Sequence, residues 1–233
     1  MFTPDFSIEN ILNLLCAIPA LVLGLTIHEF AHAWTAHKLG DDTAKNQGRV
    51  TLDPLAHLDP IGSLFILLAA FVGFFIGWAK PVPTNPRNFA HPRRDGALVA
   101  IAGPVSNLLQ VPFWLLGVAI CYYIGARFDL VEGQGAATFE LLARALSFGV
   151  IVNISLAAFN MVPIPPLDGH WILGAIAGPP VEEFFDSIRP YSFFILIVLI
   201  NIPGVAQAVI GPAYAGASTL IGWAQFLGVR WAL

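Results

Sequence analysis

The sequence predicts an all-α polytopic membrane protein with about four to six membrane helices. Of its 233 residues, 57% are hydrophobic and only 11% are charged, which lies far outside the range of a soluble globular domain. Because about 18 uncharged, apolar residues already suggest a spanning helix, long uncharged runs are candidate membrane segments. The chain has five runs near or above this length: 11–27, 61–79, 96–126, 145–167 and 190–229.

Charge and cysteine content narrow the class of protein further. The net charge of −4 says little by itself, because the orientation of a membrane protein depends on where Lys and Arg lie, and the sequence has no nucleic-acid-binding pattern. Cys16 and Cys121 lie inside apolar runs, where small buried hydrophobes are expected rather than a redox or metal motif. Asp5 and Glu9 precede the first run, so we expect a retained helix rather than a cleavable signal peptide.

No internal repeat or soluble insert divides the chain, so residues 1–233 are expected to form one membrane-embedded domain. Its motif-bearing core spans about 8–175, and C-terminal membrane segments follow at about 190–231. The stretches GRVTLDP and WAKPVPTNP are short and bounded by Gly, Pro and Asn. They predict a small β-ribbon at the membrane edge.

Ionisable residues end the first apolar run, in the stretch LGLTIHEFAHAWTAHKLG. His28, Glu29 and His32 form H-E-x-x-H, a known zinc-protease signature. Residues four apart share one helix face, so His28 and His32 can reach one metal ion. Glu29 is rotated by about 100° and can reach a water beside the metal without being a ligand. His37 faces away. Ionisable groups at membrane depth are costly, which favours function over coincidence.

A catalytic zinc site typically uses three protein ligands, so one more is needed. Asp168 stands apart, because it follows the uncharged run NISLAAFNMVPIPPL, whose prolines end a helix. Its carboxylate and Glu29 would together balance the charge of Zn²⁺. The alternative is that Asp168 merely caps the next helix, GHWILGAIAG. The candidates for the third ligand are His57, His91, Asp53, Asp59, Asp168 and His170.

Three motifs in order, HEFAH, AGPVSNLL and NMVPIPPLDG, resemble the site-2 protease family of intramembrane zinc metalloproteases, in the short form without a PDZ domain. The resemblance covers roughly residues 8–175. It implies that one zinc ion is bound by His28, His32 and Asp168, and that Glu29 is the general base. Residues at the spacing of the N-x-x-P-x-x-x-x-D-G motif are Asn160, Pro163, Asp168 and Gly169.

Two asparagines are candidates for substrate or oxyanion support. Asn107 lies in the small-residue segment IAGPVSN, whose Gly103 permits close helix contact. A buried amide can orient a substrate backbone or an oxyanion, and it can equally join helices by hydrogen bonds. Asn160 by itself suggests a structural role in the proline-rich turn, and the resemblance places both asparagines near the active site.

Residues 61–78 are expected to form a re-entrant hairpin, which Gly73 and Gly77 would allow. A full crossing would leave Asn107 far from His28 and put Asp168 on the wrong face. With re-entry, most Lys and Arg residues share the active-site face, which the positive-inside rule makes cytosolic. The basic residues on that face would be Lys38, Lys45, Arg49, Lys80, Arg87, Arg93, Arg94 and Arg189, opposed mainly by Arg127 and Arg144.

The expected activity is hydrolysis of peptide bonds in transmembrane protein substrates, within or near the lipid bilayer of the cell membrane. A membrane zinc transporter is the alternative, because histidines and acids in membrane helices also mark ion pathways. A transporter would spread such groups along several helices, whereas here they cluster. A protease with a membrane-enclosed chamber would more naturally use a glutamate as its third ligand, and a purely structural zinc would leave Glu29 without a role.

Overall fold

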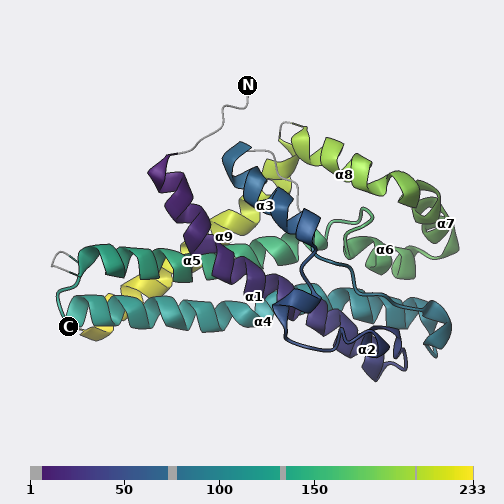
Figure 1. Cartoon of the computed structure of the whole chain (residues 1–233), viewed down its shortest axis with the longest axis horizontal. Helices are drawn as coiled ribbons and strands as arrows, with labels where there is room; N and C mark the ends of the chain where they lie inside the picture. The colour runs from purple at the N-terminus through teal and green to yellow at the C-terminus, as the bar shows by residue number, and fades with distance from the viewer. Residues whose placement is uncertain (1–6, 73–77, 132–134, 203, 233) are drawn as a thin grey trace.

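The computed structural model describes residues 7–72, 78–131, 135–202 and 204–232, and these form an almost entirely helical protein (Figure 1). The longer helices are α1 (Ile8–Lys38), α3 (Pro60–Val72), α4 (Pro92–Arg127), α5 (Ala136–Asn160) and α9 (Val205–Ala232). The shorter α-helices are α2 (Thr43–Asn46), α6 (Gly169–Ala177), α7 (Pro179–Ile188) and α8 (Ser192–Asn201). Single 3₁₀ turns lie at η1 (Pro54–Ala56), η2 (Pro86–Asn88) and η3 (Arg189–Tyr191).

Three of the described helices, α1, α4 and α5, are long and apolar enough to cross a membrane, and the number rises to four if the bent pair formed by α7–α8 and α9 is one span. The described residues thus give three to four candidate spans, at or just below the lower end of the predicted four to six. The reason is helix length: α3 has 13 residues and α8 has 10, whereas a spanning helix needs roughly 20.

The core of the bundle lies around α4. This helix packs against α1, α5 and α9, and α5 also packs against α1 and α9 (Figure 1). Small and β-branched side chains fill the contact between α4, α5 and α9, which lets these helices approach closely. The buried members of this cluster are Val111, Val118, Ala119, Val150, Ala217, Ile221 and Ala224.

The predicted β-ribbon is wrong. Among the described residues, neither stretch forms a strand, and the isolated antiparallel bridge at Ala79 pairs it with Leu58, which lies after the first stretch. The carbonyl groups of Lys80 and Pro81, which a second strand would pair, instead accept hydrogen bonds from the guanidinium of buried Arg49, at 2.6 and 3.0 Å. Prolines also supply no N–H donor to a ladder.

Backbone and side-chain hydrogen bonds hold the two ends of the segment 58–79 close together. Besides the Leu58–Ala79 bridge, the Lys80 amide donates to the His57 carbonyl at 2.8 Å. Buried Asp41, just after α1, accepts hydrogen bonds from the Asn85 amide and the Asn88 side chain, both at 2.7 Å. The chain therefore reaches the start of α4 beside the end of α1. Gly73 and Gly77 lie outside the described residues.

Candidate metal centre

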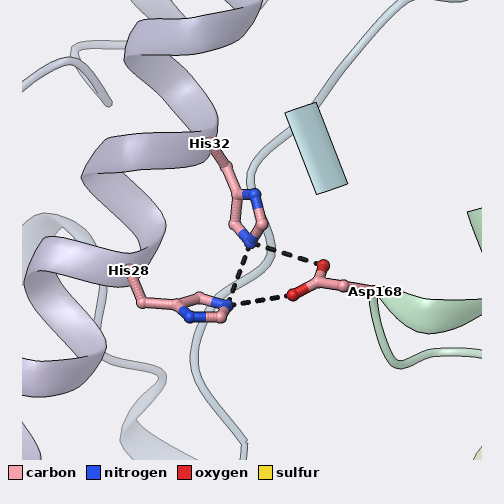
Figure 2. Close-up of side chains that lie close together, drawn as sticks. All are labelled: His28, His32 and Asp168. Atoms are coloured by element: carbon pink, nitrogen blue, oxygen red, sulfur yellow. Dashed lines mark hydrogen bonds and ion pairs between the residues drawn. The ribbon is translucent and has the colours of Figure 1, made fainter. Parts of the chain in front are cut away.

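One turn of α1 carries both histidines of the H-E-x-x-H motif. His28 and His32 are 3% and 8% exposed, and their rings meet edge to face. Their Nε2 atoms lie 3.0 Å apart and point toward the same space (Figure 2). The spacing of four residues thus places the two imidazoles on one face of α1, as the sequence predicts.

Asp168 reaches this space from the turn between α5 and α6. Its carboxylate oxygens lie 3.2 Å from His28 Nε2 and 3.4 Å from His32 Nε2 (Figure 2). Asp168 occupies the N-cap position of α6, yet its side chain makes no capping hydrogen bond. The carboxylate therefore faces the histidines rather than the helix that it precedes.

Hydrogen bonds on the far side of each ring fix how the imidazoles are oriented. His28 Nδ1 lies 2.6 Å from Asn107 Oδ1, and His32 Nδ1 lies 2.7 Å from the Val99 carbonyl. Both partners are acceptors, so each Nδ1 carries the proton and each Nε2 can present its lone pair. Two such lone pairs and a carboxylate converge on one space, and a cation between them removes their mutual repulsion.

The donor set suits a zinc ion. One ligand atom from each of His28, His32 and Asp168 lies within 4.8 Å of the other two, and two imidazoles with one carboxylate match a catalytic zinc site that keeps a position open. Asp168 Oδ2 has no hydrogen-bond partner among the described residues although it is buried. A bound cation would satisfy this oxygen.

Charge around the cluster also favours a cation. Glu29 is also buried, one position after His28. Burial lowers the pKa of Arg49, and the negative charge of Glu29 partly offsets this effect, so Glu29 acts electrostatically on Arg49.

The other candidates for the third ligand lie elsewhere and have local roles. His57 is buried and bonds the Thr51 carbonyl at 2.8 Å. Asp53 and Asp59 accept from the backbone amides of Leu55 and Gly62. The remaining two candidates also have local roles, since His91 is the N-cap residue of α4 and His170 bonds the Leu167 carbonyl. His37, which is not one of these candidates, pairs with Asp42.

Asn107 and Asn160 have different surroundings. Asn107 is fully buried; its Oδ1 contacts His28, and its Nδ2 donates to Gly24 and Asn153. Asn160 donates to the Leu156 carbonyl of its own helix. Sequence reasoning missed Asn153, which is fully buried in α5. Its position seven residues before Asn160, on the same helix face, was the available signal.

Membrane-length helices around a buried cluster of two histidines and one aspartate, with an adjacent glutamate, define a membrane-embedded metallopeptidase. Comparison with known proteins agrees. The model of peptidase family M50 matches residues 16–200. The chain belongs to this family, the site-2 protease family, and is an intramembrane zinc metalloprotease.

Relatives from bacteria and archaea are similar over most of the chain. "Putative zinc metalloprotease YwhC" of Bacillus subtilis is 42% identical over 185 residues, which is 78% of each chain. The Rip2 protein of Mycolicibacterium smegmatis is 28% identical over 81% of this chain and 67% of its own. The MJ0611 protein of Methanocaldococcus jannaschii is 30% identical over 73% of each chain. No solved structure gave a significant match. These relatives do not support the transporter alternative.

Proposed function

We propose that this protein hydrolyses peptide bonds of transmembrane protein substrates within or near the bilayer, with one zinc ion held by His28, His32 and Asp168. The single observation that carries this proposal is the convergence of the Asp168 carboxylate on the two Nε2 atoms, at 3.2 and 3.4 Å. Residues 136 or more positions apart in the chain meet there in a buried site, which local helix capping does not explain.

Bound zinc supplies Lewis acidity for the scissile carbonyl and for the attacking water. The protein supplies the proton transfers. Glu29 adjoins the ligand cluster, and no hydrogen bond engages its carboxylate among the described residues. Glu29 takes a proton from the attacking water and passes it to the leaving amine. Asp168 offsets the charge of the ion, and Val99 and Asn107 hold the two imidazoles in orientation.

The surroundings of Asn107 favour a role in orienting His28 over direct contact with an oxyanion. Both hydrogens of its Nδ2 are donated, to Gly24 and to Asn153, and its Oδ1 is engaged by His28. A substrate contact would have to break one of these bonds. For Asn160 we propose a supporting role at the turn that carries Asp168, because it ends α5 eight residues before that ligand.

We further propose that residues 61–78 form a re-entrant hairpin and that the active site faces the cytosol in the cell membrane. The Leu58–Ala79 bridge and the Asn85–Asp41 hydrogen bond support re-entry, because both ends of the segment then lie at one face. A re-entrant backbone is tolerated where protein covers it, and Trp78 packs against Phe65 and Phe193. The resulting clustering of Lys and Arg favours the cytosolic face.

Glu29→Gln tests the proposed activity. The amide keeps the shape of the side chain but loses its basicity, so zinc content should be unchanged while hydrolysis falls by about 100-fold or more. Membrane proteomes of cells carrying wild-type or Glu29→Gln protein are compared, and fragments found only with the wild type identify substrates. Exposed Glu183 is the matched control, and Glu183→Gln should cleave normally.

Undiminished cleavage by purified Glu29→Gln protein would remove the central proposal. Zinc flux into proteoliposomes that survives Glu29→Gln would point to transport instead.

A further inference from the structure

Two fully buried asparagines on neighbouring helices form a hydrogen-bonded chain that ends at the metal centre. Asn153 lies on α5 and Asn107 on α4, and both side chains are 0% exposed. Asn153 Oδ1 accepts from Asn107 Nδ2 at 3.0 Å, and Asn107 Oδ1 lies 2.6 Å from His28 Nδ1. The chain thus links three helices, α5, α4 and α1.

The direction of each hydrogen bond between these side chains follows from the Gly149 carbonyl, which lies at the far end of the hydrogen-bonded series from His28. The Gly149 carbonyl can only accept, so the Asn153 group 2.9 Å from it is the NH₂, and Asn153 Oδ1 faces Asn107. Asn107 must then present its NH₂ to Asn153 and to the Gly24 carbonyl, which leaves Oδ1 for His28. His28 Nδ1 therefore donates, and Nε2 is free to bind the metal.

We propose that Asn153 is a positioning residue for the metal centre: by holding the amide of Asn107 in one orientation, it keeps the Nε2 lone pair of His28 directed at the ion. This inference rests on the proposed role of His28 as a ligand. Asn153 touches neither the ion nor the substrate, and it acts only through Asn107.

The packing of α1 supports this role. A Cβ atom built on Gly24 would lie 3.3 Å from Asn153 Oδ1 and 3.7 Å from Asn107 Nδ2, so the backbone of α1 lies directly against both amides. The Gly24 carbonyl takes the second hydrogen of Asn107 Nδ2. The Asn107 amide consequently has no rotation that satisfies all its neighbours except the one observed.

The experiment measures the dissociation constant for zinc of the purified full chain, by competition with a chromophoric chelator. Asn153→Leu removes the acceptor for Asn107 at similar volume. If the leucine variant does not fold, the Asn153→Ala variant is measured in its place. Asn153→Asp, with its buried carboxyl protonated, keeps an acceptor oxygen toward Asn107 and a hydroxyl that donates to the Gly149 carbonyl. Asn201 is the matched control, because its side chain donates to the Ile197 carbonyl of its own helix at 2.8 Å and to no other group in the described part of the chain.

Asn153→Leu should weaken zinc binding by about 10- to 100-fold, the usual effect of losing an outer partner of a metal ligand. Asn153→Asp and Asn201→Leu should bind zinc as the wild type does. In an Asn107→Leu background, Asn153→Leu should cause no further weakening, because the link to His28 is already lost. A residue that merely joins α4 to α5 would show neither the aspartate rescue nor this non-additivity.

The proposal is overturned if Asn153→Leu binds zinc with wild-type affinity, if Asn153→Asp weakens binding as much as leucine does, or if the effect persists in the Asn107→Leu background. His28→Ala, measured in parallel, separates this failure from failure of the proposed function. Full zinc binding by His28→Ala would refute the ligand assignment itself.

Discussion

Gly103 of α4 lies so close to His32 of α1 that a Cβ atom at this position would be 2.4 Å from His32 Nε2. The same atom would be 2.6 Å from His28 Cε1. The absence of a side chain at Gly103 therefore lets α4 pack directly against both imidazoles, which is how the Val99 carbonyl and the Asn107 amide of that helix reach their Nδ1 atoms.

Gly103→Ala should consequently displace one or both imidazoles and weaken zinc binding by about tenfold or more. Gly96→Ala, on the same helix, is the matched control. Among the described residues, a Cβ at Gly96 would meet Trp171 alone, at 4.0 Å, and alanine is the better helix former. Zinc titration of both variants checks the prediction, and wild-type affinity in Gly103→Ala would show that the helices separate without disturbing the rings.

Asp168→Ala should lower both zinc content and hydrolysis, because it removes a proposed ligand rather than a base. Metal analysis of the purified protein distinguishes it from Glu29→Gln, which should keep its zinc. Asp186→Ala is a suitable control, because Asp186 is exposed and pairs with Arg189 on a helix that lies after the site. Full zinc occupancy without Asp168 would mean that another group, such as Asp53 or His57, moves in as the third ligand.

Asp41 should make the stability of the protein depend on pH in the acid range. Burial raises the pKa of Asp41, but hydrogen bonds from Thr43, Asn85 and Asn88 outweigh it and lower the pKa. The folded-state pKa is thus below the unfolded value of about 3.9, so the ionised carboxylate stabilises the fold above that pH. This stabilisation is lost as the pH falls through the folded-state pKa.

Thermal unfolding of wild type and Asp41→Asn between about pH 6 and about pH 3 measures this contribution. Asp41→Asn should be less stable near neutral pH and should lose less stability on acidification. Asp186→Asn, which also removes one negative charge, is the control. If the unfolding temperatures of wild type and Asp41→Asn fall equally as the pH is lowered, this carboxylate does not stabilise the contact between Asp41 and Asn85.

Single cysteines test the re-entrant hairpin. Lys45→Cys and Thr84→Cys are placed at exposed positions in a background without Cys16 and Cys121, and intact cells are treated with an impermeant thiol reagent. Both sites should be protected until the membrane is opened. Phe128→Cys, at the other end of α4, is the positive control and should be labelled from outside.

Labelling of Thr84→Cys from outside, with Lys45→Cys still protected, would establish a full crossing and remove the hairpin. The cytosolic orientation would fail separately, if both of these sites were labelled in intact cells.

The apolar runs and the H-E-x-x-H spacing are local features, and local features can be predicted from the sequence. Uncharged stretches predict α1, α4 and α5, because burying backbone polar groups in lipid requires long helices. The described residues give three to four candidate spans rather than four to six, because a hydrophobic run does not state where a helix ends, as at α8. The β-ribbon failed because the buried Arg49 takes the carbonyls that a strand would need.

The sequence by itself determined the class of protein, its family motifs and the pair His28 and His32, since these depend on composition and on spacing within one helix. The family resemblance already implied Asp168 as the third ligand. The tertiary structure adds that Asp168 is the member of the six candidates that meets this pair, that its side chain does not cap α6, and that Asn153 joins the network. These are contacts between residues 46 to 140 positions apart, set by how α1, α4, α5 and the turn before α6 pack. Spacing along a chain carries no information on such contacts, because they arise only once separate helices share one buried space.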